Sequence, residues 1–186
     1  MEQLIKAIEF SARAHRNQLR KRTDIPYITH PFAVALLLQE ANCSKQVVIA
    51  GLLHDTIEDT SITLEDIKRE FGDPIAHIVE ACSEPDKSQP WELRKQHTID
   101  HLKELSAEAK MVMCADKFHN LMTIALEKKS VGDKVWAKFN RGYESQKWYY
   151  HSVLSALMAD ESLFEDNPLC SRFKRLVYEM FGEPEK

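Results

Sequence analysis

The sequence predicts an all-α protein, a helical bundle around one buried core. Only five glycines and seven prolines interrupt the 186 residues, so long uninterrupted segments remain. Within them apolar residues recur every three or four positions, which is the spacing of helices, and no segment alternates as a strand would. With 44% hydrophobic residues, a chain of this length is expected to bury roughly 70% of its unfolded surface. We therefore predict a single domain over residues 1–186.

Charge and cysteine usage exclude several classes of partner. A formal net charge of −4 argues against a broad contact with nucleic acid or an anionic membrane. The four cysteines are widely spaced and form no Cys-x-x-Cys pair, which favours reduced thiols. The N-terminus lacks the basic and apolar regions of a signal peptide, and no apolar run is long enough to cross a bilayer. We predict a complete cytoplasmic protein with no nucleic-acid or membrane partner.

Helix start and stop signals divide the chain into segments. The expected helices cover, approximately, residues 4–16, 32–38, 47–53, 64–71, 73–82, 109–123, 134–158 and 168–180. Residues 18–27 contain three consecutive cations and a proline, which is typical of a loop. Residues 83–90 carry two prolines and no apolar residue, so they form the clearest loop of the chain.

The densest group of histidine and carboxylate side chains in the sequence follows the apolar run at residues 47–53. A helix that is apolar on every face is buried, so its end delivers His54 and Asp55 into the interior. Burial of such a pair is costly unless a partner compensates it, and a divalent cation bound by imidazole and carboxylate is one solution. One helical turn later, Glu58 and Asp59 are placed to act on an attacking water. The alternative is a helix cap or a solvated pair, which the apolar run and the second acid pair disfavour.

Two further polar groups interrupt apolar helices. His30 precedes Pro31, which suits the first turn of a helix, so a second imidazole is expected at the edge of the core. Asp116 interrupts a buried run, and Asn120 and Thr123 follow it on the same helical face. This stripe suits a metal ligand followed by groups that bind a ligand. A buried polar network that only fixes the helix register is the alternative.

Cations in the two loops form a candidate anion pocket. Arg20 and Lys21 lie in the first loop, and Lys87 lies in the proline-containing loop. Solvated surface charge is the ordinary explanation of such residues. Because the first loop lies directly before His30, a pocket for an anion is the alternative.

The order His30, His54-Asp55, Asp116 is the pattern of the HD superfamily of metal-dependent phosphohydrolases. The surrounding residues resemble, more narrowly, the guanosine 3′,5′-bispyrophosphate (ppGpp) 3′-pyrophosphohydrolase domain of bifunctional alarmone enzymes and of small stand-alone hydrolases. The stretches that carry the resemblance are residues 15–18, 20–21, 26–31, 52–60, 71–72 and 115–121. The His-Asp-x-x-Glu-Asp form at residues 54–59 is much more specific than His-Asp alone. No synthetase or regulatory domain fits in the remaining length, which implies a stand-alone hydrolase.

The resemblance implies an HD-domain helical bundle with the metal site in its core. The implied metal ligands are His30, His54, Asp55 and Asp116. The implied groups that act on water are Glu58 and Asp59. The implied substrate-binding residues are Arg20, Lys21, Lys87, Asn120 and Thr123. Mn²⁺ is the usual metal of the family, and two imidazoles with two carboxylates suit a six-coordinate ion better than tetrahedral zinc, although another divalent transition metal fits too.

The predicted function is Mn-dependent hydrolysis of ppGpp, or of its pentaphosphate relative, to GDP or GTP and pyrophosphate. The enzyme would be a guanosine-3′,5′-bis(diphosphate) 3′-diphosphatase of the stringent response, with a small nucleotide as its partner. One alternative is an HD phosphatase that acts on another phosphorylated nucleotide or dinucleotide cofactor. A second alternative is an inactive alarmone-binding sensor, which the presence of all the candidate ligands and both acids disfavours. The sequence leaves the oligomeric state open.

Overall fold

The computed structural model describes residues 1–84, 88–165 and 167–184. The described residues form helices joined by turns, and the one β-bridge among them is an isolated pair, Leu19 with Pro26. This confirms the all-α prediction. None of the helices in the described part of the chain has the length and hydropathy needed to cross a membrane.

The chain forms two compact units, each described here by itself. The first comprises residues 1–88 and 105–116, and the second comprises residues 89–104 and 117–186. One helix, α8 (Ala107–Val131), supplies residues to both units. The expectation of a single domain stays a prediction.

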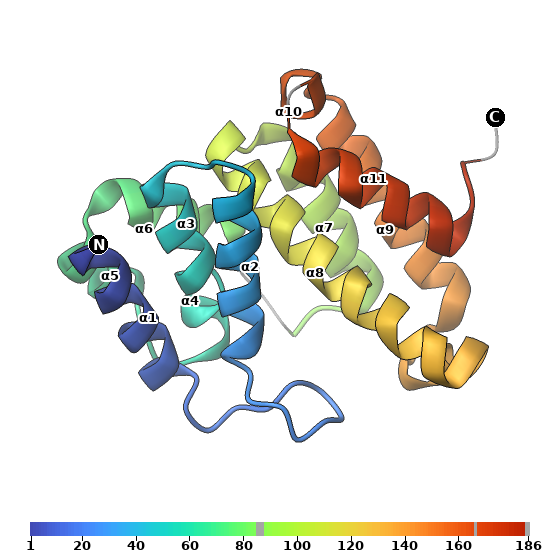
Figure 1. The fold of residues 1–186 in the computed structure, drawn as a ribbon, viewed down its shortest axis with the longest axis horizontal. Helices are drawn as coiled ribbons and strands as arrows, with labels where there is room; N and C mark the ends of the chain where they lie inside the picture. Colours follow the sequence, from blue (N-terminus) through green and yellow to red (C-terminus); the bar gives the residue numbers. More distant parts are fainter. Residues whose placement is uncertain (85–87, 166, 185–186) are drawn as a thin grey trace. The chain divides into compact units, whose positions relative to one another are not determined.

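The first unit is built around one helix that is buried on every side (Figure 1). Its helices are α1 (Glu2–Ala14), α2 (Thr29–Glu40), α3 (Lys45–Leu53), α4 (Thr56–Asp59), α5 (Leu64–Phe71) and α6 (Asp73–Cys82). The central helix α3 packs against α1, α2 and α6, and all its residues from Val47 to Leu53 are buried. This confirms the burial expected from its uniformly apolar sequence.

Close packing of α2 on α3 depends on a glycine. A Cβ added at Gly51 would lie 2.5 Å from Leu38 Cδ1 and 3.3 Å from Val34 Cγ1, both on α2. A larger side chain at this position would require the fully buried Leu38 side chain, or α2 itself, to move. Gly51 therefore permits the close packing of α3 on α2.

The helix ends of the first unit follow the sequence signals. Ser44 caps α3 through its side chain, and Thr63 forms a capping box with Asp66 at the start of α5. Gly72 ends α5 at φ +87°, a conformation that favours glycine, and α6 begins at the next residue. The helices predicted at residues 64–71 and 73–82 are confirmed.

The second unit contains α7 (Trp91–Glu104), the rest of α8, the 3-10 helix η1 (Gly132–Lys138), α9 (Gly142–Met158), α10 (Ser162–Glu165) and α11 (Pro168–Phe181). Helix α9 packs against α7 and α11. The sequence did not predict α7, in which only Ile99 and Leu102 are buried. The terminal helix predicted from Pro168 is confirmed.

The single helix expected over residues 134–158 is wrong in its first part. The chain forms η1 instead, extends at Phe139, and starts α9 at Gly142, which has φ +67°. The break lets Trp136 pack edge-to-face on Tyr143 with ring centroids 5.1 Å apart, and Trp136 also contacts Phe181 at 5.5 Å. Aromatic packing and a glycine turn therefore override the continuous helical periodicity.

All four cysteines lie among the described residues, and no disulfide joins any two of them. Cys114 and Cys170 are buried within helices α8 and α11. They pack as small apolar side chains, as the sequence predicted.

Candidate metal centre

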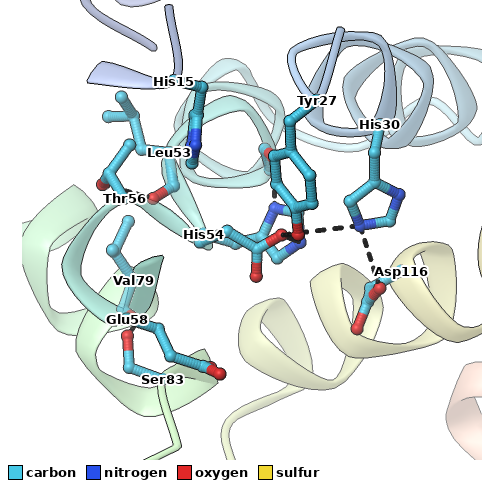
Figure 2. Close-up of polar contacts among 12 residues, drawn as sticks. His15, Tyr27, His30, Leu53, His54, Thr56, Glu58, Val79, Ser83 and Asp116 are labelled. Atoms are coloured by element: carbon cyan, nitrogen blue, oxygen red, sulfur yellow. Dashed lines mark hydrogen bonds and ion pairs between the residues drawn. The ribbon is translucent and has the colours of Figure 1, made fainter. Parts of the chain in front are cut away.

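Three helices of the first unit bring three candidate ligands together. His30 lies in the first turn of α2. This helix begins at Thr29, before the expected start at residue 32. His54 follows directly after α3, and Asp116 lies on α8. The three side chains each offer a ligand atom within 4.8 Å of the others, and all three residues are buried. Figure 2 shows them directed toward a common point.

Short polar contacts link the cluster. Nε2 of His30 lies 3.2 Å from Oδ1 of Asp116, and the rings of His30 and His54 have centroids 5.2 Å apart. The exposed fractions are only 1% for His30, 2% for His54 and 6% for Asp116. Two imidazoles and a carboxylate withdrawn from water in this way form a donor set suited to a divalent cation.

The backbone of α3 fixes the tautomer of His54. Nδ1 lies 2.7 Å from the carbonyl oxygen of Gly51, and because a carbonyl only accepts, Nδ1 carries the proton and donates. Nε2 then presents a lone pair to the cluster. This Nε2 is buried and lies 3.1 Å from Oδ2 of Asp55. Orientation of a histidine by a backbone carbonyl is typical of metal ligands, so the donor set fits a metal.

Asp55, the fourth predicted ligand, lies beside the two imidazoles. Its Oδ2 is 3.1 Å from Nε2 of His54 and 3.6 Å from Nε2 of His30. The same oxygen accepts a 2.6 Å hydrogen bond from the hydroxyl of Tyr27. Asp55 therefore borders the cluster of His30, His54 and Asp116 and is oriented by a phenol from the loop before α2.

Burial and the carboxylates set the titration of the cluster. Burial lowers the pKa of His30, and Asp116 opposes this only in part. Burial also disfavours the charge on His54, but the carboxylates of Asp55 and Asp116 outweigh it and raise the pKa of His54 to about 9. For Asp55, the charge and hydrogen bond of His54 outweigh burial and hold its pKa well below the usual range. Burial, followed by the Asp55 charge, raises the pKa of Tyr27, so its hydroxyl stays a donor.

The two predicted water-handling acids lie in a separate short helix. Helix α3 ends at Leu53, and His54 and Asp55 form the junction before α4. Oε2 of Glu58 accepts a 3.1 Å hydrogen bond from the backbone N–H of Glu84, just beyond α6. The carbonyl oxygen of Asp59 accepts a hydrogen bond from Nε2 of Gln18. Both acids are half-buried, which leaves them accessible to water.

The predicted substrate-binding residues occupy different parts of the chain. Arg20 is half-buried with its guanidinium carbon 5.7 Å from the ring centroid of Tyr27, and Lys21 is exposed in the same loop. Asn120 and Thr123 belong to the second unit, where both are half-buried on α8. Lys87 lies outside the described residues.

Sequence reasoning assigned no role to three residues that contact the candidate site. Tyr27 bonds Asp55, Gln18 bonds the end of α4, and the ring of His15 lies 5.0 Å from that of Tyr27. These contacts join residues up to 41 positions apart, so helical spacing could not reveal them. The only available signal was their occurrence within the stretches that carry the family resemblance.

An all-helical fold with a buried histidine–aspartate cluster is consistent with the matches to known proteins. Residues 7–141 match the family model of the HD domain. The chain therefore belongs to the HD domain family of metal-dependent phosphohydrolases.

Within this family, the human guanosine-3′,5′-bis(diphosphate) 3′-pyrophosphohydrolase MESH1 is 43% identical to the chain over 122 residues, covering 64% of this chain and 68% of MESH1. A GTP pyrophosphokinase of Streptomyces coelicolor is 36% identical over 137 residues, covering 72% of this chain but only 16% of that protein. A metazoan ortholog of SpoT that hydrolyses ppGpp has the same fold, with a TM-score of 0.79 and 23% identity over 98% of both chains.

Proposed function

We propose that this chain hydrolyses ppGpp, and its pentaphosphate relative, to GDP or GTP and pyrophosphate, with Mn²⁺ as cofactor. The observation that carries the proposal is the buried cluster of His30, His54 and Asp116 in an HD chain that is 43% identical to a ppGpp 3′-pyrophosphohydrolase. The substrate is a small nucleotide, and the site would serve the stringent response. A cytoplasmic location remains a prediction from the reduced cysteines.

The proposed metal ligands are His30, His54, Asp55 and Asp116. Support for this set comes from the Nε2 atoms of both histidines, which lie within 3.6 Å of Asp55 Oδ2. Four ligands leave positions open on a six-coordinate ion, which favours manganese over a closed tetrahedral zinc site. A divalent cation held there would supply Lewis acidity, lowering the pKa of the attacking water and offsetting the negative charge that grows on the phosphoryl oxygens.

Glu58 and Asp59 are the proposed proton acceptors for the attacking water. In the reaction, water oxygen attacks the phosphorus attached to the 3′ oxygen, and the bond between that phosphorus and the 3′ oxygen breaks. The water proton passes to a carboxylate, and the departing 3′ oxygen takes up a proton to become the hydroxyl. The Glu84 N–H binds Oε2 of Glu58 and so restricts the rotation of the side chain that is the candidate base.

Phosphate charge on the substrate is proposed to be held by Arg20 and Lys21, with Lys87 in the second loop and with Asn120 and Thr123 facing the nucleotide. The contact of Arg20 with the Tyr27 ring supports a position for its guanidinium beside the metal ligand Asp55. A planar guanidinium binds phosphate oxygens in pairs, and a lysine adds a point charge.

Replacement of both Arg20 and Lys21 by alanine is expected to raise KM for ppGpp by at least about 10-fold with unchanged metal content, since about 1.4 kcal/mol of binding corresponds to that factor. Steady-state kinetics and metal analysis on one preparation measure both quantities. The matched control is Lys68→Ala with Arg69→Ala, which removes the same charge from α5, where these cations pair with Glu65 and Asp66. Equal KM values for the two double variants would contradict the assignment.

The stability of the metal-free protein is expected to fall between pH 6.5 and about 9. Since the folded-state pKa of His54 is raised from 6.5 to about 9, its protonation stabilises the fold fully below pH 6.5, and this contribution is lost as pH rises through 9. The lowered pKa of His30 acts only below 6.5. A bound cation replaces the proton on His54, so metal-loaded protein should keep its Tm across this window. A metal-free Tm that rises between these pH values would contradict the electrostatic account.

A substrate panel tests the proposed function. Purified protein is stripped of metal, reloaded with Mn²⁺, and assayed on ppGpp, nucleoside monophosphates and a phosphorylated dinucleotide cofactor, with pyrophosphate and orthophosphate measured separately. Pyrophosphate release from ppGpp, with the largest kcat/KM of the panel, is the expected result. Orthophosphate release from another substrate would establish a different HD phosphatase, and ppGpp binding without turnover would establish a sensor.

A further inference from the structure

Helix α4 is too short to hold its own position. It contains only four residues, Thr56–Asp59, whereas an isolated helix needs roughly 12 or more to be marginally stable in water. The helix ends at once, because the next residue, Thr60, is extended. The placement of Glu58 and Asp59 must therefore come from contacts with other segments.

One such contact comes from the chain just after α1. Nε2 of Gln18 donates to the carbonyl oxygen of Asp59, the last residue of α4, across 41 positions of sequence. A side-chain amide thereby caps the C-terminus of the short helix. Loss of this bond would remove a donor from the carbonyl of the residue that bears one of the two acids.

The Gln18 amide is held in turn by His15. A carbonyl oxygen only accepts, so the Gln18 nitrogen must face Asp59 and its oxygen must face His15. Nδ1 of His15 lies 2.6 Å from that oxygen and therefore carries the proton and donates. His15 is 1% exposed, so its ring is fixed by packing as well as by this bond. The order of donation is His15 to Gln18 to Asp59.

His15 also contacts the segment that orients a proposed metal ligand. Its ring lies 5.0 Å from the ring of Tyr27, and Tyr27 donates to Asp55 at the start of α4. One buried histidine therefore supports both ends of α4, the N-terminal end through Tyr27 and the C-terminal end through Gln18.

We propose that His15 and Gln18 are positioning residues that hold α4, and with it Glu58 and Asp59, in the orientation needed for proton transfer from water. Neither residue belongs to the proposed ligand set or to the proposed substrate-binding residues. The kinetic consequence rests on the proposed function. The structural role of the bridge, which we define as the hydrogen bonds from His15 to Gln18 and from Gln18 to Asp59, rests on these contacts alone. A displacement of catalytic groups of about 1 Å can reduce the rate by roughly 10²-fold, so the bridge is expected to act on kcat.

The decisive variants remove hydrogen bonding and keep volume. Gln18→Met retains the length of the side chain, and His15→Phe retains a ring against Tyr27 but loses the donor. Each is expected to reduce kcat for ppGpp by about 10-fold or more, with KM and Mn²⁺ affinity within about 2-fold of wild type. His15→Asn, which restores a donor near the position of Nδ1, should recover most of kcat. Gln39→Met, at an exposed glutamine of α2, is the matched control and should leave kcat unchanged.

A second readout needs no substrate. Amide hydrogen exchange at Asp59 and Thr60, whose N–H groups bond back to Asp55 and Thr56, should be at least about 10-fold faster in Gln18→Met than in wild type or Gln39→Met. Wild-type kcat and wild-type exchange in Gln18→Met would overturn the inference. A parallel fall of kcat, metal affinity and Tm that His15→Asn does not rescue would also overturn it, because the bridge would then serve only global stability.

The two readouts separate this inference from the proposed function. If wild-type protein releases no pyrophosphate from ppGpp, the proposed function fails, while faster exchange in Gln18→Met would still support the mechanical bridge. If wild-type protein is active and Gln18→Met is equally active, the positioning role fails and the proposed function stands.

Discussion

His54→Ala and Asp116→Ala are each expected to abolish stoichiometric metal binding and to lower stability. Each variant removes one ligand atom from a buried cluster and leaves the remaining groups without full compensation. We expect metal affinity to fall by more than about 100-fold, since the loss of a group that only hydrogen-bonds to a ligand already costs roughly 10- to 100-fold. The metal-dependent stabilisation, roughly 3 kcal/mol when free metal is 100 times Kd, should disappear with it.

Metal analysis after dialysis and thermal unfolding with and without Mn²⁺ measure these effects. His77→Ala is the matched control, because His77 is an exposed histidine of α6 in the same unit. Retention of stoichiometric manganese together with ppGpp hydrolysis in either ligand variant would refute the proposed metal centre.

Glu58→Gln is expected to reduce kcat by roughly 10² or more while metal and substrate stay bound. The amide keeps the size of the side chain and can still accept from the Glu84 N–H, but it cannot take a proton from water. Asp59→Asn should behave similarly, because its carboxylate lies next along the same short helix. Glu65→Gln, at an exposed glutamate of α5, is the control and should retain full kcat.

Metal content, substrate Kd and kcat are to be measured on the same preparation of each variant. Loss of metal from Glu58→Gln would indicate that Glu58 is a metal ligand. Full kcat in this variant would indicate that Glu58 and Asp59 are only charged residues at a helix end, with no role in catalysis.

The sequence predicted the first unit well because its helices are specified locally. The apolar run before His54 predicted a fully buried helix, and Gly72 and Pro74 marked helix ends by backbone geometry that depends on neighbours only. For the same reason His30, His54 and Asp116 could be recognised one by one as polar interruptions of buried helices, and the family resemblance joined them into one ligand set.

Features set by distant contacts were not predictable from spacing. The helix over residues 134–158 breaks because Trp136 packs on Tyr143 and Phe181, and Phe181 lies far along the chain. The roles of Tyr27 and Gln18 depend on hydrogen bonds across 28 and 41 positions. Helix α7 was missed because its few buried residues leave little apolar periodicity.

The central claim is that a water activated by a cation at the proposed metal centre attacks the phosphorus attached to the 3′ oxygen of ppGpp. Hydrolysis of ppGpp by Mn²⁺-loaded protein in ¹⁸O-labelled water, followed by mass analysis of both products, tests it most directly. The account predicts one labelled oxygen in pyrophosphate, none in GDP, and no reaction after the metal is removed. Label in the 3′ hydroxyl of GDP, orthophosphate as the first product, or an undiminished rate without metal would contradict it.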